Sequence, residues 1–324
     1  MRVYRLLADR KFQSGETLAQ RCGVSRSGVW KAVGALRALG VDVHAVANRG
    51  YRLPAATELL EAERIVPLLA PALASRLRYG ETCWSTTSTN SELLRRSAVT
   101  PGEFDFLTAE YQTAGRGRRT RRWWAPPGGA ICLSLSWCFS VLPTNVGALS
   151  LAVGVCALRA LKRIGALPVG LKWPNDLVAH GCKLGGILTE LRAEADGPAL
   201  LVIGIGLNVA LGAQLAEQLA ALGAHATDLA ALGVTACDRN QLTAALIGEC
   251  IEGLRQFERS GFSAFIDEWR AADALTGKPV LVTAAEGSTA GHARGIDVAG
   301  ALCVQTRDGL QRFASADVSV RTSA

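Results

Sequence analysis

The chain has 324 residues, a mass of 34.1 kDa and a formal net charge of +7, and 49% of its residues are hydrophobic, which suits two or three domains with a buried core. No apolar run approaches the roughly 20 residues of a membrane-spanning helix, and charged residues interrupt the N-terminus where a signal peptide would be apolar. Composition therefore argues against a membrane protein or a secreted protein and predicts a cytoplasmic one.

The positive charge is concentrated at the N-terminal end. Residues 1–54 carry ten lysines and arginines against three acidic residues, whereas residues 55–324 hold 25 of each sign. A basic segment ahead of a neutral body is typical of a domain that contacts the phosphate backbone of nucleic acid.

Residues 1–54 also show the spacing of a winged helix-turn-helix. Apolar residues predict short helices around residues 3–7 and 18–22, with a turn at Gly23 before a third helix that Ser25 is placed to cap. The stretch 41–53 alternates and turns at residues 48–50, which predicts a hairpin, or wing. In the third helix the apolar stripe is Val29, Val33, Leu36 and Leu39, and the residues facing away from it are Arg26, Ser27, Lys31 and Arg37.

From about residue 59 to residue 269, strands alternate with helices. Residues 131–137 and 200–209 predict buried strands, and residues 145–165 predict a long helix. From Leu275 onward, short apolar runs separated by turns predict a small β-barrel. We therefore expect an α+β protein with a mixed α/β central domain, divided into residues 1–54, 55–270 and 271–324.

A hydroxyl-rich run, Thr-Thr-Ser-Thr-Asn-Ser at residues 86–91, opens a predicted helix. Its side chains and that of Gln112 can both donate and accept hydrogen bonds, as recognition of a neutral polar ring requires. Helix capping explains much of the run equally well. Asn208, at the end of a buried strand, has two interpretations as well: it either forms a turn or contacts a nucleotide.

The most specific stretch is the arginine loop, residues 115–129, which holds five arginines within seven residues. Two glycines, Gly115 and Gly117, allow the backbone to approach a ligand closely, and guanidinium groups bind carboxylate and phosphate through paired hydrogen bonds. The indole of Trp123 offers a stacking surface for a purine. A solvated basic loop or a patch for nucleic acid remains an equal alternative on this stretch alone.

A second charged stretch, Lys172-Trp-Pro-Asn-Asp176, is followed by Lys183 just before a pair of glycines. Proline and the Asn-Asp pair favour a turn, which places an amide and a carboxylate beside two lysines at a strand end. A half-buried lysine needs an anionic partner, and a substrate carboxylate or α-phosphate could supply it. Asp176 could instead only cap the turn.

The nine cysteines indicate reduced thiols. They are scattered between Cys22 and Cys303, none forms a CxxC pair, and their number is odd. We expect buried thiols in a reducing compartment, without disulfides or a metal site.

Together these motifs resemble the biotin protein ligase family. GRGRR with its downstream Trp123 and Pro126, KWPND at residues 172–176, KLGGIL at 183–188 and GIGLN at 204–208 occur in family order, and RGIDVAGAL looks like the family's C-terminal β-barrel. The resemblance spans the chain and is greatest to the bifunctional bacterial members, which also repress the biotin operon.

The resemblance implies a two-step reaction in which biotin and ATP, with Mg²⁺, form biotinyl-5'-AMP, and biotin then passes to a lysine of the biotin carboxyl carrier protein, a subunit of acetyl-CoA carboxylase. The implied biotin-binding residues are Ser88, Thr89, Asn90, Gln112, Arg116, Gly117, Arg118 and Lys183. The implied ATP- and adenylate-binding residues are Gly115, Arg118, Arg121, Trp123, Asn175, Asp176 and Asn208.

Lys183, Arg118 and Asp176 are the implied catalytic residues. Lys183 would stabilise charge developing on the α-phosphoryl group and the carboxylate, and Asp176 is a candidate for assisting the incoming lysine. Mg²⁺ would arrive with ATP, because the sequence shows no dedicated carboxylate cluster.

For the N-terminal block, the resemblance implies that the third helix enters the major groove of operator DNA. Arg26, Ser27 and Lys31 would face the DNA, and Arg49 would lie on the wing. The family also implies a homodimer promoted by biotinyl-AMP, because ordering the arginine loop lowers the cost of forming the interface.

One position departs from the family pattern. The loop usually contains GRGRRGR, and here Thr120 replaces the third glycine. If that residue needs a positive φ, threonine costs about 1 kcal/mol or more of strain, and loop closure would be slower or weaker.

Two other functions stay open at this point. The ligase body could be a catalytically weak biotin sensor for a repressor, although the presence of Arg118 and Lys183 argues against it. A lipoate-type ligase would share the catalytic fold, but GRGRR, KWPND and the C-terminal β-barrel favour biotin.

Overall fold

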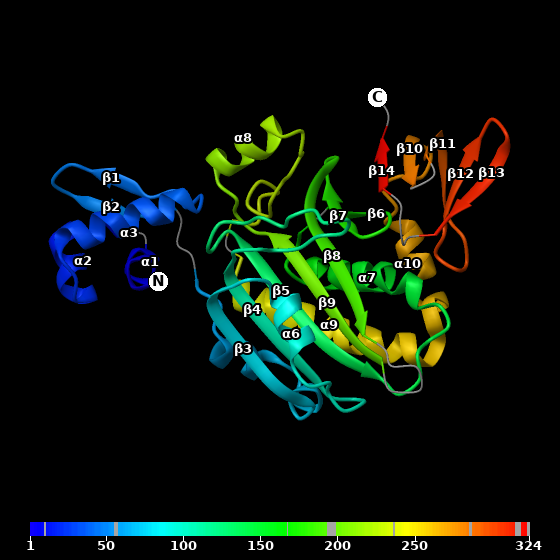
Figure 1. The fold of residues 1–324 in the computed structure, drawn as a ribbon, viewed down its shortest axis with the longest axis horizontal. Helices are drawn as coiled ribbons and strands as arrows, with labels where there is room; N and C mark the ends of the chain where they lie inside the picture. Colours follow the sequence, from blue (N-terminus) through cyan, green and yellow to red (C-terminus); the bar gives the residue numbers. More distant parts are fainter. Residues whose placement is uncertain are drawn as a thin grey trace.

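The computed structural model describes residues 1–322 except 10, 55–57, 167, 193–198, 236, 285–286 and 315–318. Three sheets follow one another along the chain: a two-stranded hairpin, a seven-stranded sheet and a five-stranded sheet. Figure 1 shows the N-terminal helices and hairpin at one end, the large sheet in the middle and the five-stranded sheet at the other end. This arrangement confirms the predicted α+β fold.

The winged helix-turn-helix has the predicted elements, namely α1 (Arg2–Leu7), α2 (Gly15–Cys22), α3 (Arg26–Ala38), β1 (His44–Val46) and β2 (Gly50–Arg52). Gly23 ends α2 in the left-handed region, and the Ser25 hydroxyl accepts the Gly28 amide at 3.1 Å, so the predicted turn and cap are confirmed. Asn48, with φ of 60°, turns the wing. The predicted apolar stripe of the third helix differs at its last residue. Leu39 is the C-cap of α3 and is only partly buried.

The seven-stranded sheet has the order β3-β4-β5-β9-β8-β7-β6, and only the β3–β4 pair is parallel. Its strands are β3 (Leu77–Thr86), β4 (Phe104–Gln112), β5 (Ala130–Phe139), β6 (Gly170–Lys172), β7 (Asp176–Ala179), β8 (Cys182–Arg192) and β9 (Ala199–Asn208). The helical elements of this region are α4 (Ala62–Ile65), η1 (Val66–Leu68), α5 (Pro71–Ala74), α6 (Thr89–Arg95), η2 (Val146–Ala148), α7 (Leu149–Arg163), α8 (Ala213–Ala221), α9 (Arg239–Ser260), η3 (Gly261–Ala264) and α10 (Ile266–Ala271).

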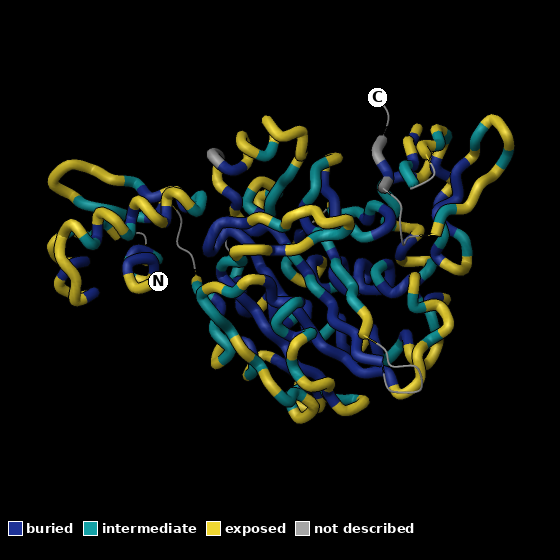
Figure 2. Tube along the Cα trace, in the orientation of Figure 1, coloured by how far each residue is buried: buried dark blue, intermediate teal, exposed yellow. Residues whose placement is uncertain are grey.

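Helices α7 and α9 cover one face of this sheet and close the main hydrophobic core (Figure 1). Strand side chains alternate between faces, and on β9 Ile203, Ile205 and Leu207 point into that core. Gly204 and Gly206 therefore lie on the opposite face, where their missing side chains leave room. In Figure 2 the buried trace follows the central strands and α7, whereas the wing and the outer loops are exposed.

The C-terminal strands form a five-stranded antiparallel sheet of order β13-β12-β11-β10-β14, which confirms the predicted small β domain. They are β10 (Pro279–Ala284), β11 (Gly287–Ile296), β12 (Leu302–Thr306), β13 (Gly309–Phe313) and β14 (Ser319–Thr322). None of the helices in the described part of the chain combines the length and apolarity that crossing a membrane requires.

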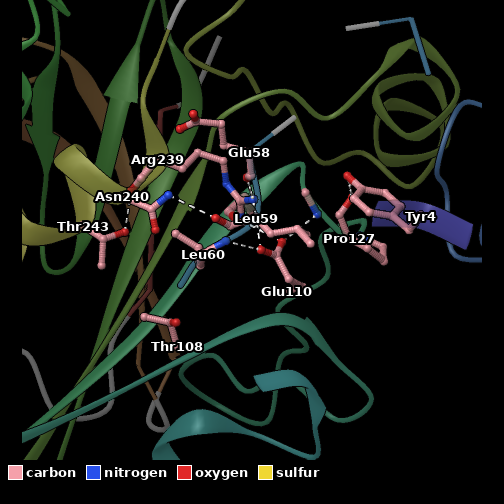
Figure 3. Close-up of polar contacts among 12 residues, drawn as sticks. Tyr4, Glu58, Leu59, Leu60, Thr108, Glu110, Pro127, Arg239, Asn240 and Thr243 are labelled. Carbon is pink, nitrogen blue, oxygen red and sulfur yellow. Dashed lines mark hydrogen bonds and ion pairs between the residues drawn. The ribbon is translucent and has the colours of Figure 1, made fainter. Parts of the chain in front are cut away.

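A buried ion pair anchors the segment that leads from the wing into the large sheet (Figure 3). Glu110 on β4 and Arg239 at the start of α9 are 4% and 3% exposed, and Arg239 Nη2 donates to Glu110 Oε2 at 2.9 Å. Glu110 Oε1 also accepts the Leu60 amide at 2.7 Å, and Arg239 donates to the carbonyls of Glu58 (2.8 Å) and Ala130 (2.6 Å). The two carboxylate oxygens of Glu110 and the two terminal nitrogens of Arg239 each have more than one partner, whereas the buried Arg239 Nε has none among the described residues. These bonds allow the pair to persist in a nonpolar interior.

Glu110 of this pair also holds the turn at residues 126–129, which ends the arginine loop just before β5. Glu110 Oε2 accepts the Gly128 amide at 3.1 Å, and the Tyr4 hydroxyl of α1 donates to the carbonyl of Pro127 at 3.1 Å (Figure 3). The Tyr4 ring also packs against Trp84 on β3, with ring centroids 5.3 Å apart. Tyr4 of the N-terminal domain therefore contacts both this turn and strand β3 of the large sheet.

All nine cysteines are free; six of them are buried, and three are partly exposed. Burial raises the pKa of Cys132 to about 11 and that of Cys156 to about 12. These thiols are protonated at neutral pH and act as small apolar side chains.

Candidate active site

A cavity of about 660 Å³ lies on the face of the large sheet opposite α7 and α9. It is lined by all but one of the residues implied for biotin and nucleotide, which are Ser88, Thr89, Asn90, Gln112, Arg116, Gly117, Arg118, Arg121, Trp123, Asn175, Asp176, Lys183 and Asn208. The exception, Gly115, lines a smaller cavity behind the arginine loop. Residues far apart in the sequence thus converge on one space.

One end of the cavity is a buried hydrogen-bonded network. The backbone amide and hydroxyl of Thr89 both donate to Gln112 Oε1, at 2.8 and 3.1 Å. Ser134 Oγ on β5 lies 2.5 Å from Asn90 Oδ1 and 2.7 Å from Thr89 Oγ1. Ser88 caps α6 by accepting the Ser91 amide at 3.4 Å, so the capping interpretation of this run is correct for Ser88. The network holds these polar groups in fixed orientations.

Glu190 on β8 connects this buried end to the arginine loop. Its Oε2 accepts Asn90 Nδ2 at 2.9 Å, and its Oε1 accepts Arg116 Nη2 at 2.7 Å. Arg116 Nη1 also donates to Ser91 Oγ at 3.1 Å. The Glu190 side chain is 19% exposed and that of Arg116 is 48% exposed, so the ion pair lies at the rim of the cavity.

The charged end of the cavity is built from the β6–β7 hairpin and β8. Lys172 pairs with Asp176 in the hairpin register, and Lys183 Nζ lies 2.5 Å from Asp176 Oδ1. Asn175 donates to the Ile187 carbonyl at 2.7 Å, and its Oδ1 accepts Arg118 Nη1 at 3.5 Å. Asp176 therefore does more than cap a turn, because it orients the half-exposed ammonium group of Lys183.

The arginine loop contains a tight turn with two residues in the left-handed region. Arg119 has φ of 54° and Thr120 has φ of 60°, and the Arg121 amide donates to the Arg118 carbonyl at 3.2 Å. This is the geometry of a type I′ turn, which favours Asn or Gly at both central positions. Position 120, where the family pattern has glycine, thus has a positive φ in this structure. Thr120 is β-branched, and such residues rarely adopt this conformation.

Trp123 lies across β9 at the floor of the cavity. A methyl group added at Gly206 would come within 2.4 Å of the Trp123 ring, so glycine is required there for the indole to approach the strand. Asn208 lines the cavity, but its Nδ2 donates to the carbonyls of Thr227 (3.0 Å) and Lys183 (3.4 Å). Its side chain thus supports the backbone beside Lys183.

Several lining or supporting residues escaped the sequence analysis. Ser134 and Glu190 bond the predicted residues from neighbouring strands, and Val320 on β14 brings the C-terminal sheet into the cavity wall. Arg119 of the loop also reaches the Thr283 carbonyl on β10, at 3.5 Å. Alternation along β5 could have identified Ser134, because it breaks an apolar strand on the face away from the core.

The predicted DNA contacts lie outside this cavity. Arg26, Ser27 and Lys31 are exposed on α3, and Arg49 is exposed on the wing. The Arg49 guanidinium stacks over the Phe12 ring at 4.3 Å, which fixes the wing against the segment before α2.

Three family profiles match the chain in succession. They are an HTH domain at residues 2–52, the biotin/lipoate A/B protein ligase family at residues 79–208, and the biotin protein ligase C-terminal domain at residues 275–321. Among solved structures, the chain is similar to a biotin protein ligase from Aquifex aeolicus in complex with biotin and ATP, with 26% identity and a TM-score of 0.63, over 76% of this chain and all of that one.

Whole-length relatives include the bifunctional ligase/repressor BirA of Salmonella typhimurium, 37% identical over 98% of this chain and 96% of the relative, and that of Escherichia coli, 34% identical over 100% and 97%. The biotin–[acetyl-CoA-carboxylase] ligase of Mycobacterium tuberculosis is 38% identical over 68% of this chain and 80% of its own length. By this similarity along nearly the whole length of both chains, the chain belongs to the biotin protein ligase family, in its bifunctional ligase/repressor group.

Proposed function

We propose that this protein joins biotin to AMP in the described cavity and then transfers biotin to a lysine of a biotin carboxyl carrier protein. The observation that carries the proposal is the convergence of Arg118 and Lys183, from two separate segments, on the cavity that also holds the network around Asn90. Two relatives with whole-length similarity are named bifunctional ligase/repressor, and a relative that is similar over 68% of this chain is named a biotin–[acetyl-CoA-carboxylase] ligase.

In the first step, a carboxylate oxygen of biotin attacks the α-phosphorus of ATP, the bond from that phosphorus to the bridging oxygen breaks, and pyrophosphate leaves. Ser88, Thr89, Asn90 and Gln112 would hold the ring end of biotin. Arg116, Gly117 and Arg118 would close over its carboxylate. Lys183, oriented by Asp176, would stabilise the negative charge that increases in the transition state.

In the second step, the amine of the carrier lysine attacks the carbonyl carbon of biotinyl-AMP, an amide forms, and AMP leaves. The amine must lose a proton, and Asp176 is the only acidic residue among the described residues that line the cavity. We assign it the role of assisting that proton loss. Trp123 would stack on adenine, and Gly115, Arg121, Asn175 and Asn208 would form or support the nucleotide side.

Mg²⁺ belongs with ATP in this scheme. The described residues contain no group of three or more His, Cys, Asp or Glu side chains that could hold a metal ion. The phosphates of ATP would therefore be the main ligands that we assign to the ion. When bound, it supplies charge neutralisation to the departing pyrophosphate.

For the N-terminal domain, we propose that it binds operator DNA and represses transcription. Support comes from the HTH match, the excess positive charge of residues 1–54 and the exposed Arg26, Ser27, Lys31 and Arg49. We further propose that the protein forms a homodimer promoted by biotinyl-AMP and that its domain boundaries lie near residues 54 and 270. We also propose a cytoplasmic location, because free thiols are consistent with a reducing compartment.

The test is a labelling assay with biotin, ATP, Mg²⁺ and an apo carrier domain, read by mass spectrometry. We expect one lysine to gain one biotinyl group, and a carrier whose target lysine is replaced by arginine to gain none. A parallel reaction with lipoate separates the two acyl groups. Absence of biotin transfer would leave only the sensor function, and preferential lipoyl transfer would reassign the substrate.

A further inference from the structure

Helix α3 presents a tryptophan to solvent in the middle of its basic face. The Trp30 side chain is 69% exposed, whereas its neighbours Val29 and Val33 are buried in the domain core. Arg26 and Lys31 are exposed on either side of it along the helix. A single exposed aromatic residue is common on protein surfaces, so a second feature is needed to give it a function.

That second feature is Gly34, one helical turn beyond Trp30 on the same face. Gly34 is exposed, and a methyl group built on it would meet none of the described atoms within 4 Å. Neither the backbone angle nor the described neighbouring atoms require a glycine at this position, although glycine weakens a helix interior relative to alanine. An exposed indole beside a bare stretch of backbone lets a second molecule approach the helix closely.

The charge of the N-terminal domain and the shape of α3 indicate that this second molecule is DNA. Residues 1–54 carry a net charge of +7, and an α-helix fits the major groove of B-DNA. Thymine is the base that presents an apolar methyl group in that groove, and apolar side chains discriminate thymine through it.

We propose that Trp30 and Gly34 form the base-reading patch of α3, in which the indole packs on thymine methyl groups and Gly34 admits the adjacent DNA surface. This inference rests on the proposed DNA-binding function. It assigns sequence discrimination chiefly to an apolar contact, while Arg26 and Lys31 supply affinity that is independent of sequence.

The experiment first selects a preferred duplex from a random-sequence pool, using the full-length protein with biotin, ATP and Mg²⁺. Affinity is then measured for the selected duplex, for a scrambled duplex, and for the selected duplex with each thymine replaced in turn by uracil, which lacks the methyl group. Trp30→Ala should weaken binding to the selected duplex about tenfold and leave the scrambled duplex unchanged. At least one uracil substitution should produce the same loss in the parent protein and no further loss in Trp30→Ala.

Matched variants separate this role from general electrostatics and from folding. Lys31→Ala should weaken binding to both duplexes and reduce the salt dependence by about one counterion. Gly34→Leu should weaken binding only to the selected duplex. Trp30→Ala should retain the parent rate of carrier biotinylation, because Trp30 is not among the residues that line the cavity.

Three results are distinguishable. Equal losses on both duplexes, or no loss, for Trp30→Ala would overturn the inference. A full additional loss when uracil is combined with Trp30→Ala would also overturn it, because the contact would then involve another residue. If the parent protein enriches no sequence, the DNA-binding function itself fails.

Discussion

The two ends of the cavity are built in opposite ways. At the ring end, Asn90 and Ser134 are 3% and 0% exposed, and their polar atoms bond other residues of the chain. At the charged end, the arginine loop is exposed at residues 119–122 and contains there two consecutive residues with positive φ. A buried, fully bonded network is pre-organised for a neutral ring, whereas an exposed strained turn can change conformation when an anion arrives. Recognition of the ring and closure over the anion are therefore assigned to different segments of the chain.

The largest effect should come from the charged end, through Lys183→Ala. The change removes the ammonium group that we assign to the developing phosphoryl charge, and loss of one such preorganised group costs about 10²–10³ in rate. Pyrophosphate release measured at saturating biotin and ATP should fall by that factor, and Lys183→Arg should recover part of it.

Lys162→Ala is the matched control, because Lys162 is an exposed lysine on α7 outside the cavity. It should keep the parent rate. A Lys183→Ala protein that is folded by circular dichroism and adenylates biotin within a few-fold of the parent would remove Lys183 from the mechanism.

At the ring end, Ser134→Ala should leave Asn90 Oδ1 without its partner and disorder the amide that we assign to biotin. An unsatisfied buried acceptor costs about 1–3 kcal/mol, so the KM for biotin should rise roughly tenfold or more while kcat changes little.

Ser136→Ala is the companion variant on the same strand, since Ser136 is equally buried but bonds the Asp105 amide outside the cavity. It should lower the free energy of unfolding without raising the KM. Equal KM values for the two variants would show that the Ser134 network is only structural.

Glu190→Gln tests whether the ring end of the cavity and the arginine loop are energetically coupled. Glutamine can still accept from Asn90, but it loses the charge that holds Arg116 at 2.7 Å. A part-buried ion pair at a rim contributes about 1 kcal/mol, so release of biotinyl-AMP should accelerate about fivefold. Stopped-flow dissociation of the adenylate measures this, with Glu81→Gln, whose partner Arg96 lies outside the cavity, as the control. An unchanged dissociation rate would mean that Arg116 holds the adenylate without help from Glu190.

Sequence patterns predicted this molecule well where the determining interactions are local. Ser25 caps α3 through an amide three residues away, and the period of the apolar residues in α3 and β9 follows from a single element. The motifs also located most cavity residues. The pattern could not predict the pairs Ser134–Asn90 and Glu190–Arg116, because they join residues 44 and 74 positions apart. Those contacts depend on β5, β9 and β8 being neighbours in the sheet, which is a property of the whole fold.

The smallest effect should come from Thr120→Gly in the arginine loop. An L-residue in the left-handed region costs about 1–2 kcal/mol, and glycine removes that cost. Glycine also loses about 0.5–1 kcal/mol more conformational entropy when the loop orders, so the net gain should be below about 1 kcal/mol.

The expected result is a two- to fivefold slower release of biotinyl-AMP by Thr120→Gly, measured by the same dissociation experiment. Thr120→Ala removes the β-branch but keeps the side-chain penalty at φ of 60°, so its rate should fall between those of the parent and the glycine variant. Faster release by Thr120→Gly would show that a flexible loop matters more than a strained one. The degree of order of the arginine loop would then explain the difference between the two ends of the cavity, and the backbone strain at position 120 would have no effect on adenylate release.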